Sequence, residues 1–430
     1  MILRAVYTLA GYLLLPFLLL YLALPKKGAG GGKGGERRRL RDFMGLADFV
    51  SRPDVPAIWF HTVSVGETLA AGRLIREFHQ EHPDFRIVVT TSTATGAACA
   101  RGIGDFVEHC YAPLDYPHAI ALFLGRVKPR MLVIMETELW PNWLAACRRR
   151  GVKTVLMNAR MSARSAGRYA RLGGFFASLI GSRLDRVLAQ TPEDADRFLR
   201  LGAKEAQVSG SLKFDIVPDG RQVEAGRAFR TRLGKRPVWI AASTHQGEDE
   251  IFLKAHLEVR KRCPKALLLL APRHPERFDG VLQLARKTDP ACRRLSELDA
   301  ASAGPGEETS VVLCDAMGQM FRLFEASDLA VMGGSFADVG GHNPLEPAAL
   351  GRPVIMGPWY YNFKAVTLKM KEAGALTLLD PGQDLAEAVA SYLADGSRAA
   401  ECGRRGREIV AAGRGSTRRT LDEIGKMLGD

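Results

Sequence analysis

Short apolar runs that alternate with helix-like stretches constrain the fold of this chain more than any other feature. In the first half these runs cover residues 57–61, 86–91, 131–135, 153–157 and 186–190. Continuous apolar runs bounded by turn residues are typical of strands buried on both faces of a parallel sheet. The pattern restarts at Pro237, with runs at 238–242, 266–270, 310–314, 328–332 and 353–356. The sequence therefore predicts an α/β fold with two Rossmann-like domains.

Length supports this division, because 430 residues are too many for one ordinary hydrophobic core. A Pro/Gly break near residue 218 and a polar stretch to Arg236 indicate the boundary. The predicted segments are a first domain (45–220), a linker (221–236), a second domain (237–410) and a C-terminal helix that returns to the first domain (411–430). The seven cysteines are scattered without a C-x-x-C pair, which favours a reducing compartment over disulfides or a zinc site.

The first 25 residues are predicted to form a membrane anchor. Residues 5–25 carry no charged side chain, and a helix of that length spans roughly 30 Å, about the thickness of a bilayer core. Pro16 could kink the helix, which leaves shallow insertion open beside a full span. A cleaved signal peptide is the rival to an uncleaved anchor. However, the apolar run is longer than such a peptide needs, and no A-x-A cleavage site follows it.

Residues 26–44 are predicted to form a basic, glycine-rich tether. Between residues 26 and 52 the chain carries eight basic and three acidic residues, which suits a flexible segment above anionic headgroups. The positive-inside rule then places the rest of the chain on the cytoplasmic side. The net charge of +13 also predicts an anionic partner. A nucleic acid is not expected, because no basic stripe studded with aromatic residues occurs.

Carboxylates follow two of the predicted strands in the first half. In parallel sheets, ligands bind beyond the carboxyl ends of the strands. Glu67 follows the first run at the start of a helix, where it could complement the helix dipole or act as a general base. Glu136 and Glu138 follow the third run. A carboxylate pair also occurs in metal and glycosidase sites, but no Asp or His lies at ligand-like spacing.

Basic residues follow the later strands of the first half. Arg160, Arg164, Arg168 and Arg171 recur at spacings that share one face of a helix. That face is either simply solvated or a patch for the phosphates of a membrane-borne acceptor. Lys213 precedes the Pro/Gly break and is a further candidate.

The second half contains a glycine-rich loop that favours nucleotide binding. The stretch 331–357 predicts a strand, a loop, a helix opened by Asn343 and Pro344, and another strand. Such a loop and helix start suit a phosphate, while Glu346 suits a ribose hydroxyl. An ordinary strand–loop–helix crossover is the alternative. Arg273, after another strand, is a candidate for phosphate. Three histidines follow strands and suggest packing or hydrogen bonding more than a metal site: His245, His274 and His342.

Five ordered motifs make the chain similar to a known family. They are SVGE (64–67), METELWPN (135–142), SGSLKFD (209–215), APRHPER (271–277) and GGHNPLEPAALGRPVIMGP (340–358). The chain resembles the Kdo transferases, which are bacterial glycosyltransferases of the GT-B type. These enzymes move 3-deoxy-D-manno-octulosonic acid (Kdo) from CMP-Kdo to the lipid A precursor, lipid IVA, in lipopolysaccharide synthesis. The resemblance runs from about residue 40 to the C-terminus and includes the N-terminal anchor.

The resemblance implies a GT-B fold, with two Rossmann-like domains facing an interdomain cleft, and an inverting reaction that needs no metal or other cofactor. It implies that Glu67 accepts the proton and that Glu138 and Lys213 stabilise the transition state. The residues implied to hold CMP are Pro272, Arg273, Met317, Gly318, Gln319, Asn343, Pro344, Leu345 and Glu346. One departure is visible, because the family often carries an acidic residue where Gln319 stands. The implied location is the cytoplasmic side of the bacterial inner membrane.

Two other functions fit parts of the sequence. One is another GT-B enzyme that uses a UDP-sugar, such as a transferase or an epimerase. The other is a membrane-tethered protein that binds lipid without catalysis. The coexistence of Glu67, Lys213 and the NPLE segment (343–346) favours an enzyme over the second alternative.

Overall fold

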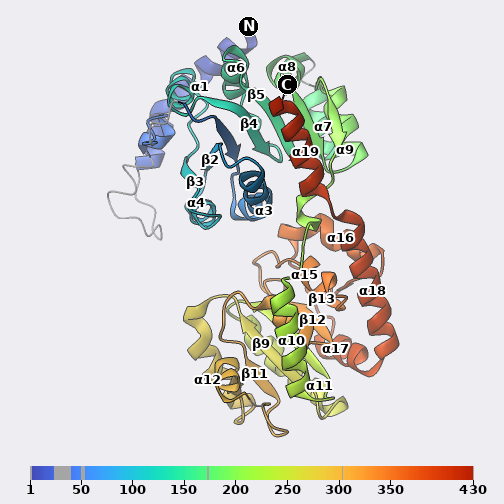
Figure 1. Cartoon of the computed structure of the whole chain (residues 1–430). Helices are drawn as coiled ribbons and strands as arrows, with labels where there is room; N and C mark the ends of the chain where they lie inside the picture. Colours follow the sequence, from blue (N-terminus) through green and yellow to red (C-terminus); the bar gives the residue numbers. More distant parts are fainter. Residues whose placement is uncertain (1, 24–39, 50–53, 172–173, 303, 430) are drawn as a thin grey trace. The chain divides into compact units, whose positions relative to one another are not determined.

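Two parallel sheets organise the chain, each within its own unit (Figure 1). The computed structural model describes residues 2–23, 40–49, 54–171, 174–302 and 304–429. Contacts divide the chain into an N-terminal unit, Met1–Asp215 with Arg414–Asp430, and a C-terminal unit, Ile216–Gly413. The α/β architecture with two parallel-sheet domains is confirmed, and the cleft between them stays a prediction.

Seven parallel strands form the sheet of the N-terminal unit, in the order β3-β2-β1-β4-β5-β6-β7. Five of them match the apolar runs of the sequence. The short strands β3 and β7 were not predicted, because polar residues interrupt them. The bounds are β1 (Ala57–His61), β2 (Arg86–Thr91), β3 (Val107–Tyr111), β4 (Pro129–Met135), β5 (Lys153–Ala159), β6 (Arg186–Ala189) and β7 (Ala206–Val208).

Helices cover both faces of this sheet, so its strands are buried on both sides. Side chains alternate between two cores: Trp59 faces one, whereas Ile58 and Phe60 face the other. The core of Trp59 includes residues of α5 (Pro117–Val127), α6 (Pro141–Arg149), α8 (Gly174–Leu179) and α9 (Pro192–Arg200). The other core includes residues of α3 (Val65–Glu81), α4 (Ala94–Arg101) and the C-terminal helix α19 (Ser416–Gly429).

A second parallel sheet forms the C-terminal unit, in the order β10-β11-β9-β8-β12-β13-β14. The bounds are β8 (Val238–Thr244), β9 (Leu267–Pro272), β10 (Arg293–Arg294), β11 (Val311–Leu313), β12 (Leu329–Met332), β13 (Val354–Met356) and β14 (Thr377–Leu378). Its main apolar core gathers residues of α11 (Glu248–Arg262), α12 (Phe278–Thr288), α17 (Leu385–Ala394) and α18 (Gly396–Gly413). The remaining helices of the unit are α10 (Gly220–Leu233), α13 (Leu295–Ala301), α14 (Met320–Ala326), α15 (Leu345–Ala349) and α16 (Lys364–Glu372).

The segment 221–236 is not a linker, as the sequence predicted, but mostly the helix α10. Asp219 caps this helix, because its carboxylate accepts hydrogen bonds from the backbone N–H groups of the first turn. Phe229 and Leu233 are buried, and Gly226 lies where a Cβ atom would meet the Arg322 carbonyl oxygen at 2.6 Å. The polar composition of α10 therefore reflects an exposed face, while its other face packs on α14.

The predicted tether, residues 26–44, lies mostly outside the described residues. Its last residues belong to the folded unit instead. Asp42 and Phe43 are buried, the backbone N–H of Tyr111 donates to the Asp42 carboxylate at 3.1 Å, and that of Leu114 donates to the Phe43 carbonyl at 2.9 Å. Residues 42 and 43, which the sequence assigned to the tether, are therefore part of the folded N-terminal unit.

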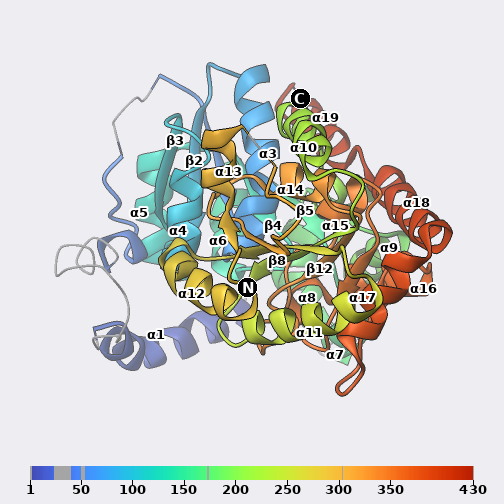
Figure 2. The same ribbon diagram turned by 90° about the horizontal axis from the view of Figure 1, so that it is seen from below.

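The first helix, α1 (Ile2–Ala23), lies on the outside of the N-terminal unit in both ribbon views (Figures 1 and 2). In the part of the chain that the structure describes, no helix is both long and apolar enough to cross a membrane. The predicted membrane anchor over residues 1–25 is therefore not supported. One side of α1 packs on the unit: Thr8 Oγ1 donates to Asn142 Oδ1 at 3.1 Å, and the Tyr116 hydroxyl donates to the Gly11 carbonyl at 2.9 Å.

Candidate active site

The sheet of the N-terminal unit reverses its winding between β1 and β4. These strands are neighbours, yet the chain leaves β1 toward β2 and leaves β4 toward β5 on the opposite side. Ligands bind at the carboxyl edge of such a switch point because the loops after the two strands diverge there. Glu67 follows β1, and Glu136 and Glu138 follow β4. The fold thus brings the predicted carboxylates to one edge.

Glu67 is held in place by the capped start of α3. Ser64 is the N-cap, and its hydroxyl accepts from the Glu67 backbone N–H and donates to the Glu67 carboxylate at 3.2 Å. The Val63 backbone N–H donates to the second carboxylate oxygen at 2.8 Å. The predicted position of Glu67 at the start of a helix is confirmed. These hydrogen bonds hold the Glu67 carboxylate in one position, and Glu67 remains partly exposed to solvent.

The environment of Glu67 makes its carboxyl a base suited to neutral pH. Burial raises the pKa of Glu67 to about 7, and the nearby charges of Glu136 and Glu138 add to the rise, while the bond from Val63 opposes it. Burial also raises the pKa of Glu138, with a contribution from Glu136. A general base works best when its pKa lies near the working pH.

Glu136, which the resemblance does not single out, connects Lys213 to this cluster. The Lys213 ammonium lies 3.6 Å from Glu136 Oε1, so Lys213 pairs with Glu136 rather than with Glu138 in this structure. The φ angle of Glu136 is 59°, in the left-handed region that non-glycine residues rarely adopt. Backbone strain of this kind clusters at functional sites because the surrounding structure must hold it.

Asn158 is a site residue that sequence reasoning missed. It is fully buried at the end of β5 and also adopts a positive φ, 52°. Its amide nitrogen donates to Glu136 Oε1 at 3.4 Å, and its amide oxygen accepts from the Leu212 N–H at 3.1 Å. Asn158 therefore positions both Glu136 and the short helix (Leu212–Phe214) that carries Lys213. The available signal was an Asn directly after a predicted strand.

The carboxylates of the candidate site do not form a set of metal ligands in the part of the chain that the structure describes. Among the residues that the structure describes, no three His, Cys, Asp or Glu side chains are arranged to hold a metal ion. The carboxylates of Glu67 and Glu136 are instead engaged by backbone, hydroxyl, amide and ammonium groups.

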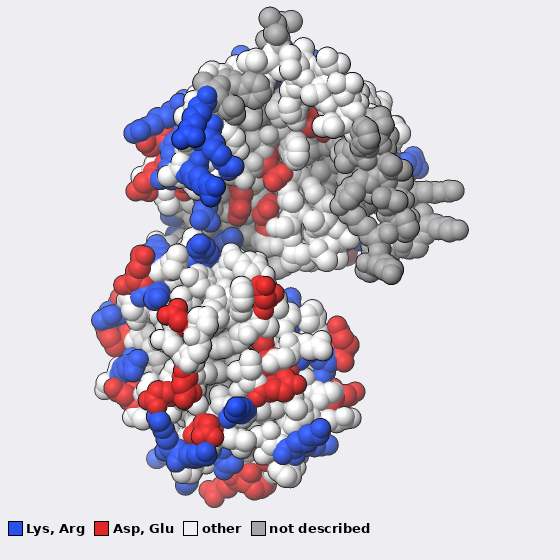
Figure 3. Space-filling view, turned by 180° about the vertical axis from the view of Figure 1, so that it is seen from behind, with Lys and Arg blue, Asp and Glu red and all other residues white. Residues whose placement is uncertain are grey.

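The predicted arginine face is only partly a helix face. Arg164, Arg168 and Arg171 lie on α7 (Ala163–Arg171), which buries none of its residues, whereas Arg160 precedes that helix. All four side chains are exposed. Figure 3 shows Lys and Arg side chains gathered on the side of the N-terminal unit where α7 lies. Exposure and charge suit either solvation or contact with phosphate.

In the C-terminal unit, the loop after β12 is organised by a buried carboxylate. Glu248, in the first turn of α11, accepts hydrogen bonds from the backbone N–H groups of His245, Gly334, Phe336 and Ala337 at 2.7–3.2 Å. Burial raises the pKa of Glu248, and these four bonds oppose the rise. Sequence analysis did not single out Glu248.

Two of the three histidines that follow strands, His245 and His342, form a neutral pair, and the His274 ring packs edge-on against His245. The Nε2 atoms of His245 and His342 are 2.8 Å apart, so one ring donates and the other accepts. Burial lowers the pKa of His342 to about 4, and the neighbouring His245 and Arg273 lower it further. Two arginines lie beside this pair: Arg273, whose side chain is exposed, and Arg277, which pairs with Asp249.

Glu346 and Arg273 are close in the structure, as the prediction of a shared ligand site requires. Burial raises the pKa of Glu346, while the Asn343 amide and the Arg273 charge oppose the rise. The Asn343 side chain contacts Glu346 Oε1 at 3.5 Å and accepts from the Leu345 N–H at 3.2 Å. The helix α15 begins at Leu345 and Pro344 occupies the N-cap position, so the predicted Asn343 cap is displaced by one residue.

The remaining predicted CMP contacts lie at the same edge of the sheet. Pro272 is the last residue of β9. The turn Met317–Gly318–Gln319 follows β11, with Met317 half exposed and Gly318 at a φ of 72°. The Gln319 side-chain oxygen accepts from Arg322 at 3.0 Å, so the amide satisfies a neighbouring guanidinium as a carboxylate could.

Comparison with known proteins decides the family. The model described as 3-Deoxy-D-manno-octulosonic-acid transferase (kdotransferase) matches residues 37–216. The 3-deoxy-D-manno-octulosonic acid transferase of Haemophilus influenzae is 37% identical, with 90% of this chain and 90% of the relative covered. This chain belongs to the Kdo transferase family. Its counterpart from Bordetella pertussis is 36% identical across 99% of this chain and 100% of that protein.

Membership in the Kdo transferase family makes the chain a glycosyltransferase by descent and confirms the resemblance carried by the five motifs. Among solved structures, UDP-GlcNAc 2-epimerase from Neisseria meningitidis, bound to UDP-GlcNAc, matches with a TM-score of 0.53 and 15% identity. That match covers 86% of this chain and 99% of the epimerase. At this identity the likeness shows the fold alone.

Proposed function

We propose that this protein transfers Kdo from CMP-Kdo to lipid IVA by an inverting, metal-independent reaction. The observation that carries the proposal is the Glu67 carboxylate, held at the switch point of the N-terminal sheet with a pKa raised to about 7. Such a group takes a proton from an attacking hydroxyl at neutral pH. Family membership supports the donor and the sugar.

In the proposed reaction, residues of the N-terminal unit act on the groups that react. The acceptor hydroxyl oxygen bonds to the anomeric carbon of Kdo, the bond from that carbon to the phosphate oxygen breaks, and CMP leaves with the electron pair. Glu67 takes the hydroxyl proton. Loss of CMP places positive charge on the sugar, and Glu138 stabilises this charge while Lys213 balances the developing negative charge. Glu136 and Asn158 hold Lys213 in position.

The residues of the C-terminal unit hold CMP in this proposal. Arg273 binds the phosphate, because its guanidinium is exposed beside two neutral histidines and can form two bonds to an oxyanion. Glu346 accepts from a ribose hydroxyl, with Asn343, Pro344 and Leu345 shaping the contact. Pro272 and the turn Met317–Gly318–Gln319 contact the cytosine base of CMP.

The acceptor is bound by the N-terminal unit at the membrane. Arg160, Arg164 and Arg168 are exposed and contact its phosphates. We infer that the enzyme acts on the cytoplasmic side of the bacterial inner membrane, attached at its surface. The basic segment 26–52 supports contact with anionic headgroups. No cofactor is required.

Offering CMP-Kdo and UDP-sugars in parallel to the purified protein, with lipid IVA as acceptor, tests the proposal. We expect release of CMP and a heavier lipid product only with CMP-Kdo. Release of UDP with product formation from a UDP-sugar would contradict the donor assignment. The Glu67→Gln variant should bind CMP-Kdo and fail to transfer.

A further inference from the structure

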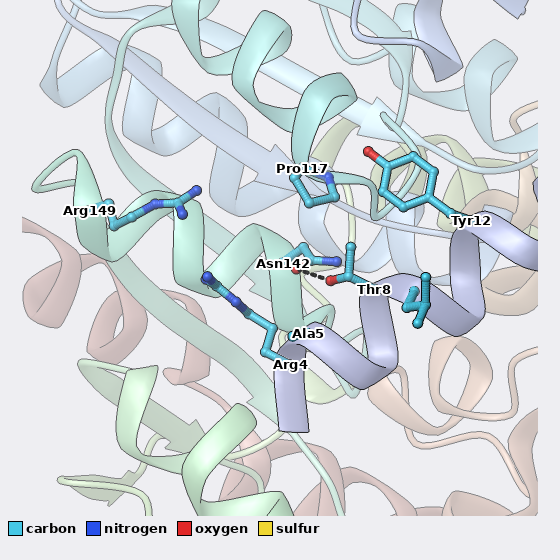
Figure 4. Close-up of a pocket in the computed structure, with 8 residues that line it drawn as sticks. Arg4, Ala5, Thr8, Tyr12, Pro117, Asn142 and Arg149 are labelled. Carbon is cyan, nitrogen blue, oxygen red and sulfur yellow. Dashed lines mark hydrogen bonds between the residues drawn. The ribbon is translucent and has the colours of Figure 1, made fainter. Parts of the chain in front are cut away.

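A cavity of about 550 Å³ lies between α1 and the body of the N-terminal unit. Its walls are partly apolar, from Ala5, Leu9 and Pro117, and partly polar, from Thr8 and Asn142. Figure 4 shows the guanidinium groups of Arg4 and Arg149 directed toward one end, with Tyr12 at the other. The volume lies within the range of small-molecule sites, and no residue of the proposed transfer site lines it.

Arg4 and Arg149 line one end of this cavity, and the charges of Arg148 and Arg183 lie near them. Burial lowers the pKa of Arg183, and the charges of Arg4, Arg148 and Arg149 lower it further. Arg183 donates to the carbonyls of Pro141 and Leu179, and Arg148 donates to that of Ser182.

Most of the positive charge of these arginines is not neutralised by a carboxylate. Asp115 is the acidic residue whose charge interacts with Arg4, but it is buried and bonded by the N–H groups of Asn142 and Trp143. Burial raises the pKa of Asp115 to about 7, so its charge is partial at neutral pH. Within the described part of the chain, none of the four arginines forms an ion pair. A cluster of guanidinium groups that form no ion pair with a carboxylate is suited to phosphate.

The apolar side of the site continues onto the surface of α1. Leu9 lines the cavity and is still 62% exposed, and Leu13 and Leu14 are exposed beyond it. A helix that carries exposed leucines beside a basic cluster is typical of a segment that lies in the interface of a bilayer. The occupant must therefore offer an anionic group and an apolar chain together, which excludes inorganic phosphate as its natural ligand.

We propose that the cavity under α1 binds an anionic phospholipid of the bilayer surface. Arg4 and Arg149 bind its phosphate, and the part of an acyl chain next to the headgroup packs along Leu9. The inference rests on the proposed function only for placing the protein at a membrane. In this proposal α1 lies in the membrane–water interface and binds lipid.

The test is co-sedimentation of the full chain with vesicles of phosphatidylcholine, with and without phosphatidylglycerol. Each basic residue near an anionic surface contributes about fivefold to binding. The Arg4→Ala/Arg149→Ala variant should therefore bind the phosphatidylglycerol vesicles about 25-fold more weakly. The control Arg101→Ala/Arg126→Ala removes two exposed arginines of the same unit and should stay close to the wild type. Equal weakening of both variants would overturn the proposal.

Two further measurements keep the proposal falsifiable. Arg149 is exposed at the end of α6, so the single Arg149→Glu variant should fold and should also lose vesicle binding, by fivefold or more. Hydrogen exchange should show α1 protected by phosphatidylglycerol vesicles but not by inorganic phosphate. Equal protection by both would assign a free-phosphate site instead. Transfer by the wild type to detergent-dispersed acceptor tests the proposed function separately, since that assay contains no bilayer.

Discussion

The raised pKa of Glu67 predicts a specific dependence of the reaction rate on pH. With a pKa of about 7, about one tenth of the carboxyl is ionised at pH 6 and about nine tenths at pH 8. Because only the ionised form accepts a proton, the rate of transfer should rise about tenfold between these values. A glutamate at its usual pKa would be almost fully ionised throughout, and the rate would then change little.

The assay is single-turnover release of CMP, with enzyme in excess, across pH 6 to pH 8. The Glu67→Gln variant keeps the shape of the side chain but cannot accept the proton. Its rate should fall by roughly 10²- to 10⁴-fold and lose the rise with pH. Glu77→Gln is the matched control, because Glu77 lies on the same helix and pairs with Arg73 away from the cluster.

Two results would refute this reasoning. A flat profile for the wild type between pH 6 and pH 8 would mean that Glu67 does not control the chemical step. A Glu67→Gln variant with near-normal turnover would remove the residue from catalysis altogether. Binding of CMP-Kdo by the variant, followed by calorimetry, separates lost chemistry from lost folding.

Three other changes test the structure around the two sites. Lys213→Met should reduce the rate of transfer by roughly 10²-fold or more, because it removes the charge that stabilises the transition state. The control Lys204→Met changes a surface lysine that pairs with an aspartate and should leave the rate unchanged. Equal rates for the two variants would exclude a catalytic role for Lys213. Glu248→Gln removes acceptors from buried N–H groups and should lower the free energy of unfolding by about 3 kcal/mol in urea denaturation; an unchanged midpoint would contradict the bonded loop. Gly403→Ala places a Cβ atom 1.9 Å from a backbone oxygen and should cost about 2 kcal/mol, whereas Gly396→Ala, with open space around it, should be neutral.

Much of the fold followed from the sequence, because strands buried on both faces must be apolar throughout. The strands β1, β2, β4 and β5 therefore appeared as clear runs. Edge strands carry no such requirement, so β3 (VEHCY) was not apparent. The helix α10 was taken for a linker because one exposed face made its composition polar.

The candidate site was predictable in its positions but not in its contacts. The rule that ligands lie beyond strand ends located Glu67, Glu138 and Arg273. Pairing between side chains from separate loops, such as Lys213 with Glu136, depends on backbone conformations that sequence patterns do not specify. The positive φ of Glu136 is one of these, and it directs the side chain toward Lys213.

The apolar N-terminus shows a different limit of sequence patterns. Its uncharged run has the composition of a spanning anchor, yet polar groups within it bond to the folded unit, among them Thr8 to Asn142 and Tyr12 to His118. A hydropathy pattern counts such residues as tolerable interruptions, whereas in the structure they are the contacts that position α1.

The most direct test of the central claim is the mass of the product formed from lipid IVA and CMP-Kdo by the purified protein without added metal. We predict a lipid heavier than the acceptor by one or more Kdo residues, with one CMP released for each Kdo added. The number of Kdo residues would be read from the same spectrum. Unchanged lipid in the presence of intact donor and folded protein would contradict the account.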